Sequence, residues 1–284
     1  MWNLEGCVAV ITGAGSGIGR ELALALAGRG CRLALNDRDL ARLAETEALL
    51  PTDGELVYTQ AFDVTEGGRL EHFAAQVGEY FGGVDILINN AGVALGPVAA
   101  HETSDEDIRW IMDINLFAVV DGTRAFMPYL QQSPRSALVN ISSLFGLVGM
   151  LGNGAYCASK WAVRGFTETL RIELEETHPH VLVTCVHPGG VRTQIARDSK
   201  RVAGVAAERH GRLTEKFEQH AMRTDADVAA ETIVAGLEAR RNRILIGADA
   251  YRADALNRLT PSPSGAVVRG LGKLTGMEIG DGVS

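Results

Sequence analysis

Short apolar runs alternate with longer amphipathic stretches along this chain, and no other feature limits its possible folds as strongly. The run Cys7–Thr12 ends at a glycine-rich turn, and the stretch Gly17–Gly30 that follows has the apolar spacing of a helix. Strands that alternate with helices pair in parallel and are joined by right-handed crossovers. Apolar strands such as Ile86–Ile88 indicate a sheet that is covered on both faces. We therefore predict an α/β fold with one doubly wound, mostly parallel sheet.

The same alternation assigns residue ranges to the expected elements. Strands are expected at Cys7–Thr12, Arg32–Asn36, Leu56–Phe62, Asp85–Asn89, Ala137–Ile141, Val181–Val186 and Ile244–Ile246. Helices are expected at Gly17–Gly30, Asp39–Leu50, Arg69–Tyr80, from a cap at Ser104 toward Pro128, and at Ala155–Glu176. Strand, helix and strand recur without an internal linker, which predicts one domain.

That domain is expected to span residues 1–260 and to include a substrate loop at 194–225. A stretch rich in proline and serine, Thr260–Gly265, separates it from a C-terminal extension, 261–284. The extension has some helical spacing, so it could pack on a neighbouring subunit, be loose or touch a membrane surface. We favour the first two, because the segment is short and only weakly basic.

Composition excludes several classes of function. The net charge of −8 makes the chain a poor nucleic-acid binder, because such binding depends on cationic contacts to phosphates. No apolar run approaches the roughly 18 residues of a membrane span, and the first residues do not resemble a secretion signal. The four scattered cysteines indicate reduced thiols in a cytoplasmic protein. The histidines show no paired ligand spacing, so we expect no catalytic metal.

The glycine-rich turn Thr12–Gly19 is a candidate phosphate site. Its glycines are Gly13, Gly17 and Gly19, and the turn follows a predicted strand and opens a predicted helix. Backbone amides at a helix start can hold a pyrophosphate, and the missing Cβ atoms let phosphates come close. This context predicts a nucleotide-binding turn, although the glycine spacing differs from the commoner dinucleotide fingerprint.

Tyr156 and Lys160 form a candidate catalytic pair. They are four residues apart, which is one helical turn, so the phenol and the ammonium can point the same way. A nearby cation can make a phenol acidic enough to move protons near neutral pH. The chain has only four lysines and five tyrosines, so this spacing has a low chance of being accidental.

Taken together, these motifs resemble those of the short-chain dehydrogenase/reductase family. They occur in the order and at the intervals of that family, and Ser143 lies thirteen positions before Tyr156 as its pattern requires. The resemblance implies a Rossmann-type fold with a seven-stranded sheet and an NAD(P)-dependent oxidoreductase. The motifs that carry it are Thr12–Gly19, Asn89-Asn90-Ala91-Gly92, Asn115, Ser143, Tyr156-x-x-x-Lys160 and Pro188-Gly189-Gly190-Val191-x-Thr193.

The resemblance also implies a catalytic role for four residues. Tyr156 would be the general acid in ketone reduction and the general base in alcohol oxidation, for which its ordinary pKa of about 10 must fall. Lys160 would favour the phenolate and bind the nicotinamide ribose, and Ser143 would hold the substrate oxygen. Asn115 would hold a water that links Lys160 to solvent. Ser142 is the alternative serine, but the interval to Tyr156 favours Ser143.

A second set of residues is expected to bind the cofactor. The acidic side chain of Asp37, at the end of the second strand, would accept hydrogen bonds from the adenosine ribose and repel a 2′-phosphate, which favours NAD. Arg38 argues for the alternative, NADP, because it could pair with that phosphate. The expected cofactor-binding residues are Gly13, Ser16, Gly17, Ile18, Gly19, Asp37, Arg38, Asp63, Val64, Asn90, Gly92, Tyr156, Lys160, Pro188, Gly189, Val191 and Thr193.

The substrate is less well defined by the sequence. The loops expected at the site are Val93–Pro97, Leu144–Gly154 and the segment after Thr193. The second loop is apolar, and its side chains either line a hydrophobic pocket or pack between subunits. The third carries Arg197, Lys200 and Arg201, which could bind an anionic substrate such as an acyl thioester but more readily form a solvated face.

We therefore predict reversible oxidation of a secondary alcohol to a ketone on a moderately hydrophobic substrate. The alternatives are NADPH-dependent 3-oxoacyl reduction, a catalytically silent nucleotide sensor or scaffold, and a sugar-nucleotide epimerase or dehydratase. The last fits poorly, because those enzymes have a different glycine spacing. By resemblance, the chain is expected to form a homotetramer or homodimer through the helices after Ser104 and at Tyr156–Glu176.

Overall fold

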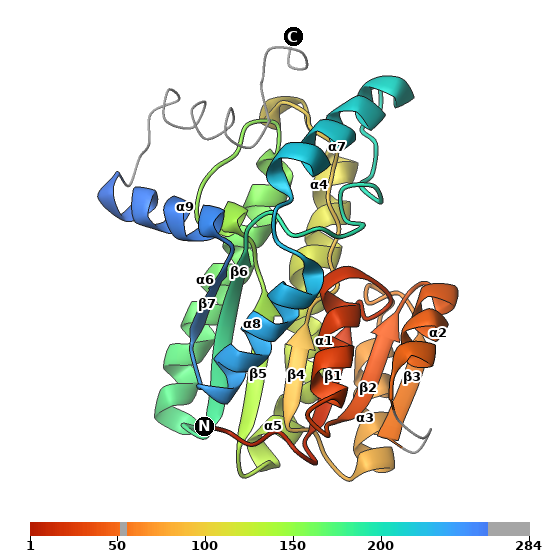
Figure 1. Cartoon of the computed structure of the whole chain (residues 1–284), viewed down its shortest axis with the longest axis vertical. Coiled ribbons are helices and arrows are strands. Elements are labelled where there is room, and N and C mark those ends of the chain that lie inside the picture. The colour runs from red at the N-terminus through yellow and green to blue at the C-terminus, as the bar shows by residue number, and fades with distance from the viewer. Residues whose placement is uncertain (52–55, 261–284) are drawn as a thin grey trace.

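The structure is a computed structural model that describes residues 1–51 and 56–260. Seven parallel strands form one sheet in the order β3-β2-β1-β4-β5-β6-β7 (Figure 1). The chain order reverses between β1 and β4, and open α/β sheets bind ligands beyond the strand ends at such a point. All seven predicted strands are present: β1 Val8–Thr12, β2 Arg32–Asp37, β3 Val57–Ala61, β4 Ile86–Asn89, β5 Ser136–Ile141, β6 Val181–Pro188 and β7 Arg243–Ile246.

Helices cover both faces of the sheet, which confirms the predicted single doubly wound domain. On one face, Leu22 and Leu26 of α1 share a buried core with Ile233 of α8. On the other face, Phe73 of α3 and Phe126 of α5 meet edge to face, with ring centroids 6.0 Å apart. The first face carries α1 Gly17–Ala27, α2 Leu40–Leu49 and α8 Ala226–Glu238, and the second carries α3 Arg69–Phe81, α5 Ala118–Gln132 and α6 Gly154–Thr177.

The helical region after Ser104 differs from the prediction. Instead of one helix that ends toward Pro128, the chain forms α4 (Asp105–Met112), a π-helical turn (Asp113–Phe117) and then α5, which contains Pro128. A proline inside a helix removes one backbone hydrogen bond. Phe126 and Leu130 on either side of it are fully buried against the sheet. Burial of two such side chains outweighs the lost bond, because each contributes about 1.5–3 kcal/mol.

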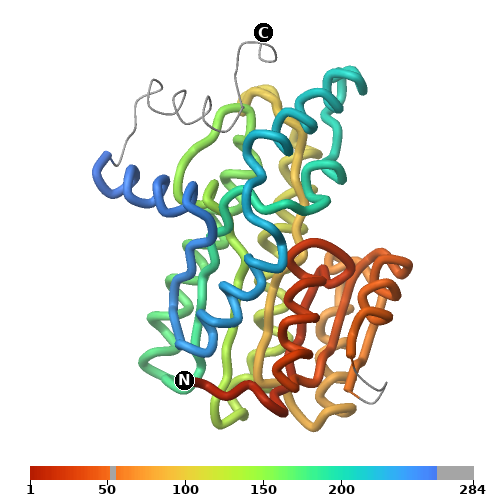
Figure 2. Tube along the Cα trace, in the orientation of Figure 1, coloured from red at the N-terminus to blue at the C-terminus, as the bar shows by residue number. Residues whose placement is uncertain are grey.

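Three helices of the C-terminal third were not predicted from the sequence. They are α7 (Ala207–Ala221), α8 and α9 (Ala248–Leu259). The chain leaves the end of β6, forms α7 beyond the carboxyl ends of the strands, and returns to α8 on one face of the sheet (Figure 1 and Figure 2). The predicted extension, 261–284, lies outside the described residues. Within the described part of the chain, no helix combines the length and the apolar character that a membrane span requires.

Candidate active site

One cavity of about 600 Å³ lies at the carboxyl ends of the strands. It extends from Asp37 at the end of β2 to Tyr156 on α6, so the two halves of the predicted site are continuous. All but two of the predicted site residues line it: Gly13, Ser16, Gly17, Ile18, Asp37, Arg38, Asp63, Val64, Asn90, Gly92, Ser143, Tyr156, Lys160, Pro188, Gly189, Val191 and Thr193.

Gly19 is the first of the two exceptions, and it packs against the backbone of the glycine turn without lining the cavity. A Cβ atom at Gly19 would overlap the carbonyl oxygen of Gly13. That oxygen and the carbonyl oxygen of Thr12 accept hydrogen bonds of 3.0 Å from the Asn90 side-chain amide. Gly19 therefore allows the turn to close onto the end of β4, and Gly17 reverses the chain with a φ of 53°.

Asn115 is the second exception. It is fully buried in the π-helical turn, where its Oδ1 accepts from the Val93 N–H at 2.8 Å. Its Nδ2 donates to the Val93 carbonyl and to Ser159 Oγ. A Cβ atom at Gly92 would lie 3.3 Å from Asn115 Oδ1 and 3.4 Å from Lys160 Nζ, so both atoms face the same spot. The Asn115 side chain thus braces the Val93 loop beside Lys160.

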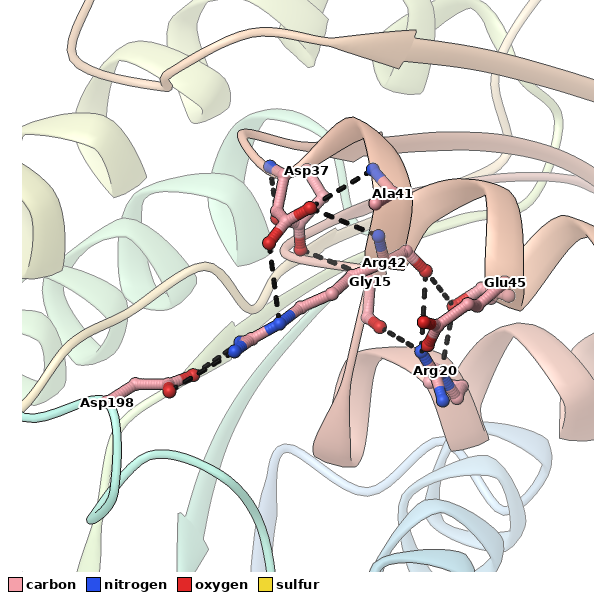
Figure 3. Close-up of polar contacts among 9 residues, drawn as sticks. Gly15, Arg20, Asp37, Ala41, Arg42, Glu45 and Asp198 are labelled. Carbon is pink, nitrogen blue, oxygen red and sulfur yellow. Dashed lines mark hydrogen bonds and ion pairs between the residues drawn. The ribbon is translucent and has the colours of Figure 1, made fainter.

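The adenosine-side corner of the cavity is formed around Asp37 (Figure 3). One carboxylate oxygen of Asp37 accepts from the Gly15 N–H at 2.8 Å, and the other accepts from the Asp39 N–H at 2.9 Å. These two amides fix the carboxylate next to the glycine turn. Arg38 is exposed at the same corner, and it makes no hydrogen bond or ion pair with any residue of 1–51 or 56–260.

Tyr156, Lys160 and Ser143 meet at the other end of the cavity. The Lys160 ammonium lies 5.8 Å from the centre of the Tyr156 ring and donates to the Ile141 carbonyl at 3.0 Å. Ser143 hydrogen-bonds to Tyr156, whereas Ser142 donates to the Lys160 backbone carbonyl at 2.8 Å. This geometry favours Ser143 over Ser142 as the partner of the phenol.

The pKa of Tyr156 shifts in the direction opposite to the one we expected. Burial raises it to about 12, and the hydrogen bond from Ser143 offsets only part of this rise. Burial also lowers the pKa of Lys160 to about 8, so this amine stays mostly protonated at pH 7. The cause is desolvation, which penalises both charged forms, while the Lys160 ammonium is directed at the Ile141 carbonyl.

Comparisons with known proteins identify the family of this chain. A family model described as short chain dehydrogenase matches residues 7–203. The chain belongs to the short-chain dehydrogenase/reductase family. A relative named oxidoreductase SadH, from Mycobacterium tuberculosis, is 43% identical over 263 residues, which cover 92% of this chain and 94% of the relative.

Solved structures of the family agree with the fold. A short-chain dehydrogenase/reductase from Burkholderia phymatum, in complex with NAD, matches with a TM-score of 0.84 and 31% identity, over 92% of this chain and 96% of that one. A short-chain dehydrogenase from Streptomyces avermitilis matches with a TM-score of 0.77 and 28% identity, over 95% and 98%. They confirm the Rossmann-type short-chain dehydrogenase/reductase fold.

The apolar loop Leu144–Gly154 divides its side chains between two environments. Leu144, Phe145 and Leu151 line the cavity. Leu147, Val148 and Met150 do not line the cavity, and they share a buried cluster with Ala250 and Ala253 of α9, to which Leu144 and Phe145 also belong. The sequence offered only a pocket or a subunit contact for these three, because α9 was not predicted.

Two parts of the cavity wall were not predicted from the sequence. Leu213 and Phe217 of α7 cover the cavity from beyond the sheet, and with Ala221 they repeat every four residues, a spacing that predicts a helix face. Asp249 at the start of α9 accepts from the Gly190 N–H at 2.6 Å and so holds the turn after β6. No sequence signal marks Asp249, since its partner is far along the chain.

The three cations that the sequence singled out after Thr193 already have partners, which favours the solvated face over an anion site. Arg197 and Lys200 each form an ion pair with a nearest distance of 2.8 Å, and the partner of Lys200 is a buried carboxylate. Their partners are Glu218 for Arg197, Asp107 for Lys200, and the backbone carbonyl of Val205 for Arg201.

Across residues 1–51 and 56–260, no group of three or more histidine, cysteine or acidic side chains could hold a metal ion.

His187 on β6 predicts acid sensitivity of this site. Burial lowers its pKa from 6.5 to about 4, while its Nδ1 contacts the Ser143 carbonyl at 3.2 Å. The folded state therefore resists protonation, and stability is lost as pH falls from 6.5 toward 4. We expect His187→Asn to retain about 3 kcal/mol more of its neutral-pH stability than wild type does at pH 4. Urea unfolding of both proteins at pH 7 and pH 4 measures this, and equal losses would contradict it.

Proposed function

We propose that the protein is an NAD(P)-dependent oxidoreductase that interconverts a secondary alcohol and a ketone on a moderately hydrophobic substrate. The observation that carries this proposal is the continuity of the cavity, which joins the glycine turn to the group of Ser143, Tyr156 and Lys160. A cavity of this kind can hold a nucleotide cofactor at one end and expose the substrate to an acid/base group at the other.

The residues present fit a nicotinamide dinucleotide. Ser16, Gly17 and Ile18 place the first amides of α1 on the cavity wall, where a helix N-terminus can bind a pyrophosphate. The fixed carboxylate of Asp37 would accept hydrogen bonds from the adenosine ribose. Lys160 would bind the nicotinamide ribose and Thr193 the carboxamide. The bound nicotinamide would supply the hydride chemistry, which no side chain provides.

The proton would move through Tyr156. Because the pKa of its phenol is raised, Tyr156 is protonated at neutral pH and ready to donate to a ketone oxygen that Ser143 holds. In the reverse direction it must accept a proton, which the positive charge of Lys160 would favour. Lys160 and Asn115 Oδ1 face one spot at Gly92, which supports a water relay to solvent at that point.

The side chains of the cavity wall support a moderately hydrophobic substrate. Leu95, Leu144, Phe145, Leu213 and Phe217 surround the space beside Tyr156 and would bind an apolar substrate body. Arg197 and Lys200 already bind acidic side chains, which argues against their use as an anion site for the 3-oxoacyl alternative. A silent sensor or scaffold remains the non-enzyme alternative, against which the complete catalytic set argues.

A substrate screen tests the proposal directly. Purified protein would be incubated with NAD⁺ or NADP⁺ and a panel of aliphatic, alicyclic and aromatic secondary alcohols, and with NADH or NADPH and the matching ketones. Nicotinamide fluorescence reports turnover. Primary alcohols and 3-oxoacyl thioesters serve as comparison classes. Cofactor binding without any turnover across the panel would favour the silent alternative.

We expect NAD to be preferred over NADP. The Asp37 carboxylate would repel a 2′-phosphate, so kcat/KM for NAD should exceed that for NADP by about tenfold or more, the equivalent of about 1.4 kcal/mol. Asp37→Ser should reduce this ratio, and Asp39→Ser, two residues further along the chain, should change it less. A clear NADP preference of the wild-type protein would show that Asp37 does not set the choice.

We further propose assembly as a homotetramer or homodimer in the cytoplasm. Phe117 in the π-helical turn and Trp161 and Ile172 on α6 are large apolar side chains that are 43–57% exposed. They lie on the helices that the resemblance assigns to subunit contact. Light scattering coupled to size-exclusion chromatography measures the number of subunits.

A further inference from the structure

A second arginine lies beside the Asp37 corner of the cavity. Arg42, in the first turn of α2, lines the cavity together with Arg38 and Asp37. A Cβ atom at Gly15 would lie 3.0 Å from Arg42 Cβ and 2.8 Å from Asp37 Cγ, so both side chains start at the glycine turn. The Asp37 carboxylate is also among the charges that raise the pKa of Arg42, so the guanidinium lies near the position that an adenosine ribose bound to Asp37 would occupy.

The guanidinium of Arg42 is paired with the carboxylate of Asp198, which lies in a distant part of the chain. Both oxygens of Asp198 accept from Arg42, one from Nη1 and the other from Nη2 at 3.2 Å (Figure 3). Asp198 lies in the segment that leads from β6 to α7, and it also lines the cavity. On its other side, Arg42 Nε is 3.4 Å from Asp39. Arg42 is thus neutralised by a bidentate contact with Asp198 and by Asp39, the N-cap residue of α2.

We propose that Asp198 is a specificity-determining residue that disfavours a 2′-phosphorylated cofactor by occupying Arg42. A guanidinium binds a phosphate through the same fork of N–H donors that it offers a carboxylate, so one ligand excludes the other. Asp198 also adds a negative charge at the cavity wall, which repels a phosphate but not a ribose hydroxyl. This inference rests on the proposed function and adds to it a determinant from the substrate-side segment.

The exposure of the pair sets the size of the effect. The side chains of Arg42 and Asp198 are 37% and 38% exposed, so solvent screens the pair and a phosphate can displace Asp198 at modest cost. We therefore expect a contribution of about fivefold to the discrimination, smaller than that of Asp37.

The experiment compares binding of NAD⁺ and NADP⁺ by isothermal titration calorimetry, without any substrate. In Asp198→Asn, which frees Arg42, the Kd for NADP⁺ should fall about fivefold, while the Kd for NAD⁺ stays within twofold. The matched control is Glu218→Gln, which removes one negative charge and leaves Arg197 unpaired near the same segment. It should leave the ratio of the two Kd values unchanged. Arg42→Ala combined with Asp198→Asn should lose the gain.

Each other outcome has a definite meaning. If Asp198→Asn changes both Kd values equally, the pair only positions the segment and the inference is wrong. If Glu218→Gln relaxes the ratio as much, net charge and not Arg42 is responsible, and the inference is again wrong. If the wild-type protein binds neither nucleotide, the proposed function fails and the inference fails with it. If both nucleotides bind but Asp198→Asn leaves the ratio of their Kd values unchanged, the inference is wrong while the proposed function stays intact.

Discussion

Replacing Tyr156 by phenylalanine is expected to lower kcat by about a thousandfold while the Kd for NAD⁺ stays within about twofold. The substitution removes one oxygen from the cavity end of α6 and keeps the ring that contacts Phe145 at a centroid distance of 6.0 Å. General acid/base groups contribute about 10²- to 10⁴-fold to a rate. Removal of the hydroxyl also leaves Ser143 without the partner that would align the substrate oxygen.

Stopped-flow and steady-state rates with the best alcohol from the screen give kcat, and calorimetry gives the Kd. Tyr251→Phe on α9 is the matched control, since that tyrosine is 57% exposed and does not line the cavity. It should keep wild-type turnover. If Tyr156→Phe retains near wild-type turnover with NAD bound, proton transfer does not pass through this phenol.

Gly19→Ala is expected to lower the free energy of unfolding by about 2 kcal/mol and to weaken NAD⁺ binding by at least about tenfold. Alanine in a helix interior stabilises by about 1 kcal/mol relative to glycine, but overpacking costs about 1–3 kcal/mol. The upper end of this cost applies here because the backbone of Gly13 must move, which leaves a net loss of about 2 kcal/mol. The new methyl group would overlap the Gly13 carbonyl oxygen and lie 2.5 Å from Asn90 Nδ2. The turn must then open, which displaces the amides that would hold the pyrophosphate.

Gly211→Ala is the matched control for this substitution. Gly211 is an exposed glycine inside α7, and a Cβ atom there would meet nothing within 4 Å. This variant should be slightly more stable than wild type and should bind NAD⁺ equally well. Urea unfolding and calorimetry of both variants measure the two effects. Gly19→Ala with wild-type stability and affinity would show that the turn tolerates a side chain.

Sequence patterns predicted those features that depend on near neighbours along the chain. The apolar runs gave the seven strands, since a strand buried on both faces needs continuous apolar residues. The glycines of Thr12–Gly19 predicted the turn between β1 and α1. The four-residue spacing of Tyr156 and Lys160 placed both on one side of α6, facing the cavity.

Other features depend on contacts between distant residues, and the tertiary structure alone decided them. Burial of Phe126 and Leu130 kept α5 helical through Pro128. Desolvation reversed the expected shift in the pKa of Tyr156.

The chain's local order determined the strands, the glycine turn and the pair on α6, because propensity and periodicity act over a few residues. Folding alone decided how Asp198 reaches Arg42 and how Asp249 reaches Gly190. Those pairs are separated by 156 and 59 residues, and at such separations only the packing of the sheet and helices determines which side chains meet.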